Sequence, residues 1–307
     1  MLHPAHPSSL VRRLATGALI ALLTATPDAH ATPRDDGATA ETLGLADAVR
    51  ASVWGPASLV WNPAGLLRVP ALLAQANYNY LDGEGGHAFS AGLLDARTSP
   101  VSALGVQYTF VDATRAGVRR EGHQLRLGLG TGHRAGDFGL FAGVGARWLK
   151  LDLTPAAGAS SRLDAWTVDL GLLFDFADRV RFGAAAQNLL TLDHADARRA
   201  LGLGLSFVFD GLEVGATLDL DLSGLARTPD GARRTITSWA LGADYGLGDA
   251  LRLRAGLAGD ALAERERLTA GLGWSTPTVG LDLGWSTALV DPADMVFAAT
   301  LRLLPSH

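Results

Sequence analysis

The stretch Asp164–Phe176, DAWTVDLGLLFDF, carries the clearest pattern in this chain of 307 residues. Every second residue from Trp166 to Phe176 is apolar, and the residues between them include Asp169 and Asp175. Successive side chains of a β-strand point to opposite faces, so this alternation predicts a strand with one apolar face and one polar face.

The same alternation recurs from residue 71 to the end of the chain. We count fourteen such segments, centred near Asn77, Ala91, Val106, Leu127, Val144, Leu170, Ala184, Leu205, Ala216, Leu241, Leu253, Leu272, Leu283 and Ala299. Most of them offer about 9–11 residues, the length that a tilted strand needs to cross a bilayer. Twelve and fourteen strands both stay open at this point, because the segments near Ala91 and Leu272 are short.

The connections between these segments alternate in length. The short ones are Asp95–Pro100, Thr131–Gly136, Phe176–Asp178, Asp210–Gly211, Gly246–Ala250 and Ser275–Thr278. Between these lie longer, more charged connections, namely Val111–Gly122, Leu151–Leu163, Asn188–Arg199, Leu222–Thr235 and Ala258–Arg267. The first and last of this series, Leu81–Gly86 and Ala288–Asp294, are shorter but keep the same parity. Short periplasmic turns and longer outer loops are typical of transmembrane barrels, and the parity predicts that both ends of the barrel domain lie on the periplasmic side.

The chemistry of the two faces separates a membrane barrel from a soluble β-sandwich, whose apolar face would be the inner one. Charged residues within the segments lie on the polar face, as lipid contact on the other face requires. Most strand glycines also lie on the polar face, where they leave room for something inside, and aromatic residues cluster near the segment ends. We therefore predict an all-β protein: a transmembrane antiparallel up-and-down β-barrel in the outer membrane of a Gram-negative-type cell.

The N-terminus has the features of a secretory signal peptide over residues 1–31. Arg12 and Arg13 precede the apolar run Leu14–Ala25, and the sequence AHA ending at Ala31 fits a cleavage site that leaves Thr32 first. A disordered N-terminal tail is the alternative. The predicted organisation is thus a signal peptide at 1–31, a leader and lumen hatch at 32–69, and the barrel at 70–307.

The apolar segment Leu43–Val69 lacks the two-residue period and needs a place out of water. We predict that it lies in the lumen or its periplasmic mouth as a hatch. Within it, Asn62, Pro63, Ala64 and Gly65 have the composition of a capped turn, since Asn accepts from backbone N–H groups and Pro presets φ. The alternative is a simple turn that leads into the first strand.

The stretch SLVWNPAGL at residues 58–66 resembles the Asn-Pro-Ala hatch motif of the FadL-like outer-membrane superfamily, which transports fatty acids and other hydrophobic compounds. The stretches RFGAAAQNL (181–189) and WALGADYGLGDALRLRAG (239–256) resemble elements of its PorV/PorQ-type branch. The resemblance implies a hatch-closed barrel. The outer connections here are short, and no insertion for an apolar capture groove is present, so the substrate does not carry over.

Polar residues on the predicted lumen face are the candidate ligand contacts. They are Gln107, Arg126, Arg147, Asp169, Arg181, Gln187, Asp219, Asp244, Arg252 and Arg254. The arginines could meet a carboxylate headgroup, or they could form structural salt bridges with Asp169, Asp219 and Asp244.

Other chemistry finds little support in the sequence. The chain has no cysteine, its formal net charge is −5, and its histidines show no metal-ligand spacing. We therefore expect no cofactor, no metal, no nucleic-acid partner and no enzymatic activity. The favoured hypothesis is passage of small hydrophobic compounds, fatty-acid-like, across the outer membrane, with bilayer lipid and a hydrophobic ligand as partners. The alternative is a non-transporting structural or secretion-associated barrel that binds a protein partner.

Overall fold

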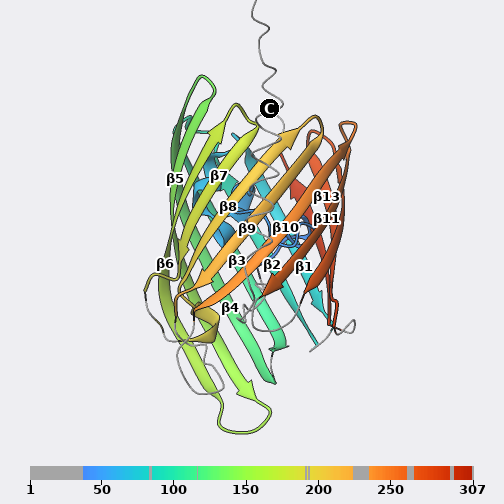
Figure 1. Ribbon diagram of the computed structural model, residues 1–307. Helices are drawn as coiled ribbons and strands as arrows, with labels where there is room; N and C mark the ends of the chain where they lie inside the picture. The colour runs from blue at the N-terminus through green and yellow to red at the C-terminus, as the bar shows by residue number, and fades with distance from the viewer. Residues whose placement is uncertain are drawn as a thin grey trace, which may run out of the picture.

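A closed barrel surrounds the N-terminal segment of the protein (Figure 1). This computed structural model describes residues 37–82, 85–115, 117–190, 192, 194–223, 235–260, 266–290 and 294–305. The predicted signal peptide, residues 1–31, lies outside the described residues, and its cleavage stays a prediction.

Fourteen strands form the barrel in the described part of the chain, which confirms the predicted architecture and the higher of the two strand counts. They are β1 (Leu72–Leu81), β2 (Gly86–Asp95), β3 (Ser102–Arg115), β4 (Val118–Ala135), β5 (Phe138–Pro155), β6 (Ser161–Phe176), β7 (Val180–Gln187), β8 (Ala200–Phe209), β9 (Leu212–Asp221), β10 (Ile236–Leu247), β11 (Leu251–Asp260), β12 (Arg267–Ser275), β13 (Val279–Ala288) and β14 (Met295–Leu303). Each strand pairs antiparallel with its neighbours in the chain, and β1 pairs with β14, so the sheet has no free edge strand.

The two faces of each strand differ as the alternation predicts. On β6, Leu170 and Leu172 are 48% and 47% exposed on the outside, whereas Asp169 and Asp175 are 4% and 1% exposed on the inside. An exposed apolar band around a polar, buried interior suits a wall that faces lipid.

Strands β3 to β6 are longer than predicted, at 14 to 18 residues. The predicted long connections Val111–Gly122 and Leu151–Leu163 are therefore wrong, because most of each is strand, with a turn at Gly117 and an irregular stretch at 156–160. The two-residue period continues there with the faces reversed. Most charged side chains there point outward, and leucine and valine point inward; Arg120 is the exception and is buried on the inner face. In these two segments, charged residues occupy the outer face, which is apolar in the rest of the strand, and such a pattern resembles that of a loop.

The two ends of the barrel differ, as Figure 1 shows. The short turns and the described C-terminal residues lie at one end, which we call the inner end, and the long hairpins β3–β4 and β5–β6 reach past the other, the outer end. The general rule for such barrels assigns the inner end to the periplasm.

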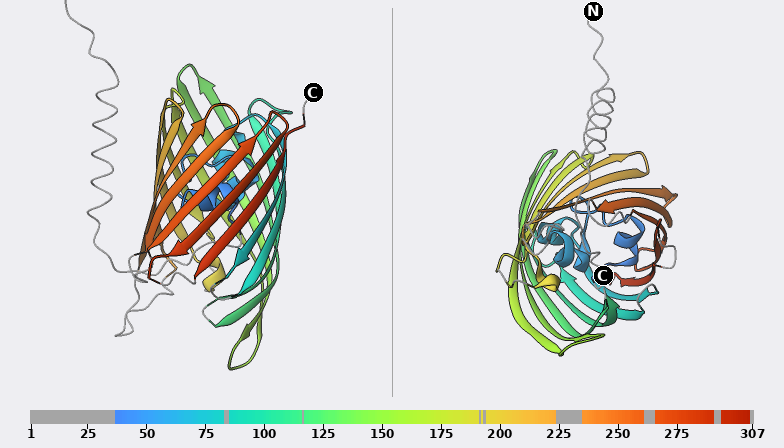
Figure 2. Two further views of the ribbon diagram at one scale, coloured as in Figure 1. Left: turned by 90° about the vertical axis from the view of Figure 1, so that its right-hand side faces the viewer. Right: turned by 60° about the horizontal axis from the view of Figure 1, so that its bottom comes forward.

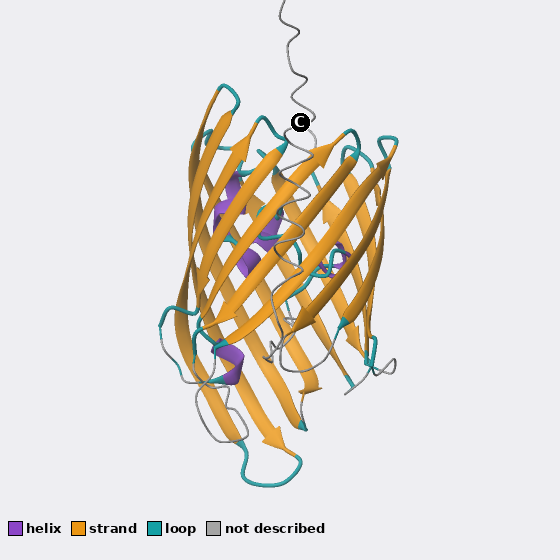
Figure 3. Ribbon diagram, viewed as in Figure 1, coloured by secondary structure: helices purple, strands orange, loops and turns teal. Residues whose placement is uncertain are grey.

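Residues 37–70, which we call the plug, lie inside the barrel (Figures 2 and 3). The plug contains α2 (Ala40–Gly44), η1 (Gly55–Ala57), α3 (Ser58–Trp61) and η2 (Pro63–Leu67), and a further short helix, η3 (Ala195–Ala197), lies between β7 and β8. Among the described residues, no helix has both the length and the apolarity needed to cross a membrane.

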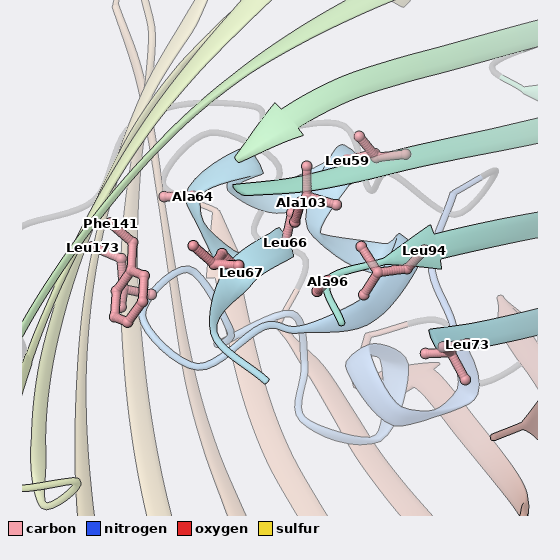
Figure 4. Close-up of a cluster of buried hydrophobic side chains, with 10 residues drawn as sticks. All are labelled: Leu59, Ala64, Leu66, Leu67, Leu73, Leu94, Ala96, Ala103, Phe141 and Leu173. Atoms are coloured by element: carbon pink, nitrogen blue, oxygen red, sulfur yellow. The ribbon is translucent and has the colours of Figure 1, made fainter. Parts of the chain in front are cut away.

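A hydrophobic core joins the plug to the barrel wall (Figure 4). Leu59 and Leu66 of the plug pack with Leu94 of β2, Ala103 of β3 and Phe141 of β5. Leu59 and Leu66 are 2% and 0% exposed, so the plug is anchored by apolar burial and not only by polar contacts.

Candidate functional site

Glycines of the wall bring the plug into direct contact with the strand backbones. One glycine from each of β2 to β13 has a plug atom where its side chain would lie, and we call this set the glycine belt. It comprises Gly92, Gly105, Gly128, Gly143, Gly171, Gly183, Gly204, Gly215, Gly242, Gly256, Gly271 and Gly284. A methyl group at Gly143 would overlap the backbone of Pro63, and one at Gly171 would overlap Asn62. The room that the sequence predicted on the lumen face is therefore filled by the plug.

The predicted hatch residues lie inside the lumen, at the centre of the plug. The Asn62 side chain accepts from the N–H of Ala64 at 3.1 Å, and its amide donates to the carbonyls of Arg50 at 2.8 Å and Leu172 on β6 at 3.1 Å. Pro63 begins η2, and a side chain at Gly65 would overlap the carbonyl of Val53. The motif thus caps its own turn and also ties the plug to the wall.

Arg50, which the sequence analysis did not single out, holds the plug to two further strands. Its guanidinium donates to Asp219 of β9 at 2.5 Å, to the Trp61 carbonyl at 2.6 Å and to Gln187 of β7 at 3.0 Å. Gln187 in turn donates to the Val60 carbonyl at 2.5 Å. Two predicted ligand contacts, Asp219 and Gln187, therefore hold the plug. An arginine inside an otherwise apolar segment was the signal available in the sequence.

A second ionic chain crosses β10 to β14 and ends on the plug. Asp244 accepts from Arg252 at 3.0 Å and from Arg254 at 3.3 Å. Arg254 also pairs with Asp282 at 2.7 Å, and Asp282 pairs with Arg302 at 2.6 Å. Three of the predicted ligand contacts, Asp244, Arg252 and Arg254, thus form salt bridges with one another. This agrees with the alternative prediction, in which the lumen arginines have a structural role.

Glu41 of α2 closes this chain by accepting from Arg302 at 2.9 Å. Burial disfavours the ionised carboxylate of Glu41, but nearby guanidinium groups, those of Arg302 and Arg254 above all, lower its pKa below the ordinary value. The three carboxylates and three guanidinium groups of the chain balance. Asp282, Arg302 and Glu41 were not among the predicted site residues, because their pairing depends on strand register.

Arg181 belongs to a third group of charges at the inner end of the barrel. It donates to Asp175 at 3.3 Å and to Glu213 of β9 at 2.9 Å. Glu213 also accepts from the Ser206 hydroxyl at 2.6 Å. Arg181 is therefore separated from the other predicted contacts and is occupied by wall carboxylates.

The remaining predicted contacts lie together between the plug and the outer end. Gln107, Arg126, Arg147 and Thr167 are direct neighbours across β3 to β6, and we call them the arginine row. All four are buried, and Arg147 donates to Gln124 at 2.8 Å. Within the described residues, the side-chain oxygens of Gln107 and Thr167 have no hydrogen-bond partner. Asp169, next to the row, accepts from the backbone N–H of Asn188 at 2.6 Å.

Beyond the arginine row, the inner wall becomes largely apolar toward the outer end, although the buried polar side chains of Thr109, Gln124 and Arg120 also point inward there. The apolar inward side chains are buried or partly buried; they are Val111 and Ala113 of β3, Val118 of β4, Leu149, Leu151 and Leu153 of β5, and Leu163 of β6. We call this set the apolar wall. It results from the face reversal on the long strands and was missed because those residues were assigned to loops.

No group of three or more histidine, aspartate or glutamate side chains that could hold a metal ion occurs among the described residues.

This architecture is similar to that of known outer-membrane proteins. A family model described as Gram-negative porin matches residues 42–260. No curated protein sequence matches the chain.

Several solved structures share the fold. The CymD monoaromatic hydrocarbon channel superposes with a TM-score of 0.68 at 15% identity, over 90% of this chain and 100% of that one. The Pseudomonas putida toluene transporter TodX gives 0.63 at 14% identity, over 89% and 100%. A FadL homologue from Pseudomonas aeruginosa gives 0.58 at 14% identity, over 91% and 99%.

These similarities confirm the predicted resemblance to FadL-like barrels at the level of the fold, whereas the PorV/PorQ-type branch stays a prediction. CymD is described as a channel and TodX as a transporter, and the family model is described as a porin. Since the family model spans most of the chain and the barrel and plug fit it, this protein belongs to the Gram-negative porin family of outer-membrane β-barrels.

Proposed function

We propose that this barrel carries small hydrophobic compounds with one anionic end, of the fatty-acid type, across the outer membrane. The observation that carries the proposal is the succession, along the inner wall, of an apolar wall at the outer end and an arginine row beneath it. The apolar wall could contact the hydrocarbon tail of such a compound, and the arginine row could bind its anionic end.

The apolar wall argues against passage of hydrophilic solutes. The lumen of a water-filled porin is polar. Here Leu149 and Leu151 point into the lumen at 0% exposure, next to Arg147 on the same face of the same strand. Leucines on the lumen face favour solutes that gain from leaving water.

The arginine row supports an anionic end on the cargo. Arg126 and Arg147 lie directly opposite each other on β4 and β5. A carboxylate can accept from two guanidinium groups, and such hydrogen bonds are stronger than those between neutral groups. The oxygens of Gln107 and Thr167 that lack protein partners could accept from a hydroxyl group or a water molecule that accompanies the cargo.

The structural relatives support the hydrophobic class of cargo but not its headgroup. CymD and TodX are described as a monoaromatic hydrocarbon channel and a toluene transporter, and hydrocarbons have no carboxylate. Binding of a carboxylate in preference to a hydrocarbon would therefore distinguish this chain from those relatives.

The experiment compares two probes, octanoate and toluene, on the full-length protein refolded in detergent and in liposomes. We expect octanoate to bind. The substitution Arg126→Gln should lower the affinity for octanoate by about tenfold to a hundredfold, because a hydrogen bond to a charged group contributes about 1.5–3 kcal/mol. Toluene binding should stay unchanged in that variant. The matched control is Arg119→Gln on the same strand, whose side chain is 54% exposed on the outer face.

Two results would overturn the proposal. Equal weakening of octanoate and toluene by Arg126→Gln would mean that the variant disturbs the lumen in general. Absence of octanoate binding and uptake in the unaltered protein would remove the anionic headgroup from the cargo.

The alternative function, a non-transporting barrel that binds a protein partner, has one observation in its favour. The hairpin β5–β6 projects beyond the rest of the barrel (Figure 1) and bears exposed ion pairs such as Arg162–Asp152 on its outer face. A stable co-purifying protein that is lost when residues 152–162 are replaced by a short turn, together with no uptake of either probe, would support this alternative.

A further inference from the structure

The connection between β7 and β8 turns into the lumen. Asn188 follows β7 with a φ of 53°, a left-handed conformation that asparagine tolerates better than most residues. Asn188 and Ala197 are buried, at 5% and 3% exposure. Figures 1 and 3 show η3 at the outer end of the barrel. We call the described residues of this connection, 188–190, 192 and 194–199, the lid.

The lid occupies a place where the wall lacks a strand. β7 pairs with β6 only from Leu170 to Phe176, although β6 extends back to Ser161. Beyond Leu170 the edge of β6 meets the lid, since the N–H of Leu189 donates to the Val168 carbonyl at 2.9 Å. The lid therefore covers the lumen and also contacts the edge of β6 at Val168, just beyond the last residue that pairs with β7.

Two ion pairs hold the C-terminal part of the lid to the wall. Arg120 of β4 pairs with Asp196 at 2.5 Å, and their side chains are 7% and 9% exposed. Arg198 pairs with Asp221 of β9 at 3.1 Å. Lid side chains two positions apart therefore reach two different strands, β4 and β9.

The pair Arg120–Asp196 is buried, whereas the ion pairs on the outer hairpins are exposed to solvent. Arg119 and Asp112 are 54% and 38% exposed, and exposed pairs contribute little. Removing one partner of a buried pair leaves an uncompensated charge and is strongly destabilising. Arg120 and Asp196 therefore define one closed position of the lid.

Arg147 of the arginine row also holds the lid. Its guanidinium donates to the Asp196 carbonyl at 3.2 Å and to the Asn188 side chain at 3.4 Å. An anion that accepts from Arg147 would compete with both of these contacts. The same residue therefore faces the proposed cargo and the lid.

From these contacts we infer that the lid is a gate at the outer end, latched by Arg120–Asp196 and released when an anionic ligand binds Arg147. Displacement of the lid opens the lumen above the arginine row and leaves the edge of β6 that faces away from β5 uncovered from Ser161 to Val168. The release step rests on the proposed function, because it requires the anionic end of the cargo, whereas the latch does not.

The latch is tested by accessibility of the lumen, without transport. A cysteine placed at Thr109, which is 0% exposed on the lumen face of β3, reports entry of a membrane-impermeant methanethiosulfonate reagent, because the natural chain has no cysteine. We expect Asp196→Asn to accelerate labelling by about tenfold or more, since it breaks a buried pair. Asp152→Asn, which breaks the exposed pair with Arg162, is the matched control and should leave the rate unchanged.

A reducible bridge tests whether the lid must move. In the variant Arg120→Cys/Asp196→Cys, a bis-methanethiosulfonate cross-linker should abolish octanoate uptake by liposomes, and a reductant should restore it. The control Asp112→Cys/Arg119→Cys carries the same bridge on the outer face and should transport equally with and without it.

The outcomes separate the lid from the cargo. Unchanged labelling in Asp196→Asn, or full uptake through the bridged lid, would overturn the gate. Faster labelling in Asp196→Asn with no octanoate uptake in the unbridged protein would leave the latch standing and overturn both the proposed cargo and ligand-driven release. Octanoate that accelerates labelling of the Thr109→Cys protein would support release, and octanoate without any effect on labelling would overturn it.

Discussion

Nε of Arg50 lies 2.5 Å from Oδ1 of Asp219, and this contact joins the plug to a strand that follows it by 169 residues in the chain. The Arg50 side chain is fully buried, and its other donors reach Trp61 and Gln187. One side chain thus links the plug to β7 and β9.

Arg50→Met should loosen the plug and lower the stability of the folded barrel by about 3–5 kcal/mol, because it leaves the Asp219 carboxylate without its buried partner. The measurement is the urea midpoint of unfolding from lipid vesicles. In the double variant Arg50→Met/Asp219→Leu the unpaired charge is gone, so much of the loss should be recovered. A double variant as unstable as the single one would contradict this account of the contact.

Gly143→Ala should displace the plug, because the added methyl group would overlap the backbone of Pro63. Overpacking of this kind costs about 1–3 kcal/mol or more. Protease accessibility of the plug in the refolded protein measures the effect. Gly145→Ala is the control on the same strand and face, where the nearest atom to the new methyl group would be 3.6 Å away. Equal proteolysis of the two variants would refute the role of the glycine belt.

Asn62→Leu should open a leak through the barrel. The substitution keeps the approximate size of the side chain but removes the bonds to Arg50, Ala64 and Leu172. Each buried group left without a partner costs about 1–3 kcal/mol. Liposome swelling in arabinose should be faster for this variant than for the unaltered protein. No change in swelling would indicate that the hatch residues do not keep the lumen closed.

Acid should weaken the contact between α2 and the wall. Arg302 and Arg254 lower the pKa of Glu41 from its ordinary value of 4.5, so the contribution of the ionised carboxylate is full above that pH and is lost as the pH falls through the lowered pKa. The difference in unfolding midpoint between the natural protein and Glu41→Gln should therefore shrink as the solution is acidified below pH 4.5. A difference that grows on acidification would have the wrong sign.

Cleavage of the signal peptide is tested directly on protein isolated from outer membranes. The sequence AHA ending at Ala31 predicts Thr32 as the first residue. Mass spectrometry of the intact protein measures this. A mature chain that begins at Met1 would remove the predicted export signal.

The sequence predicted the strands of the barrel and the position of the plug better than it predicted where the long strands end. All fourteen predicted segment centres fall within strands, because the two-residue period and the chemistry of each face are local features. The position of the hatch in the lumen also agreed with expectation, since an apolar segment without a strand period needs burial. The predicted outer ends of β3 to β6 were wrong, because there the same two-residue period places most charged residues on the outer face, which is apolar in the rest of each strand.

The sequence by itself determined that this protein is a membrane barrel with a filled lumen, because lipid on one side and a plug on the other impose their chemistry on alternate residues. Only the tertiary structure decided which lumen charges are paired. Asp244 and Arg254 adjoin each other through strand register, whereas Arg50 and Asp219 meet across the lumen, and Asp196 reaches Arg120 only because its connection folds inward. Such pairings depend on register, curvature and packing between segments far apart in the chain, which no local pattern encodes.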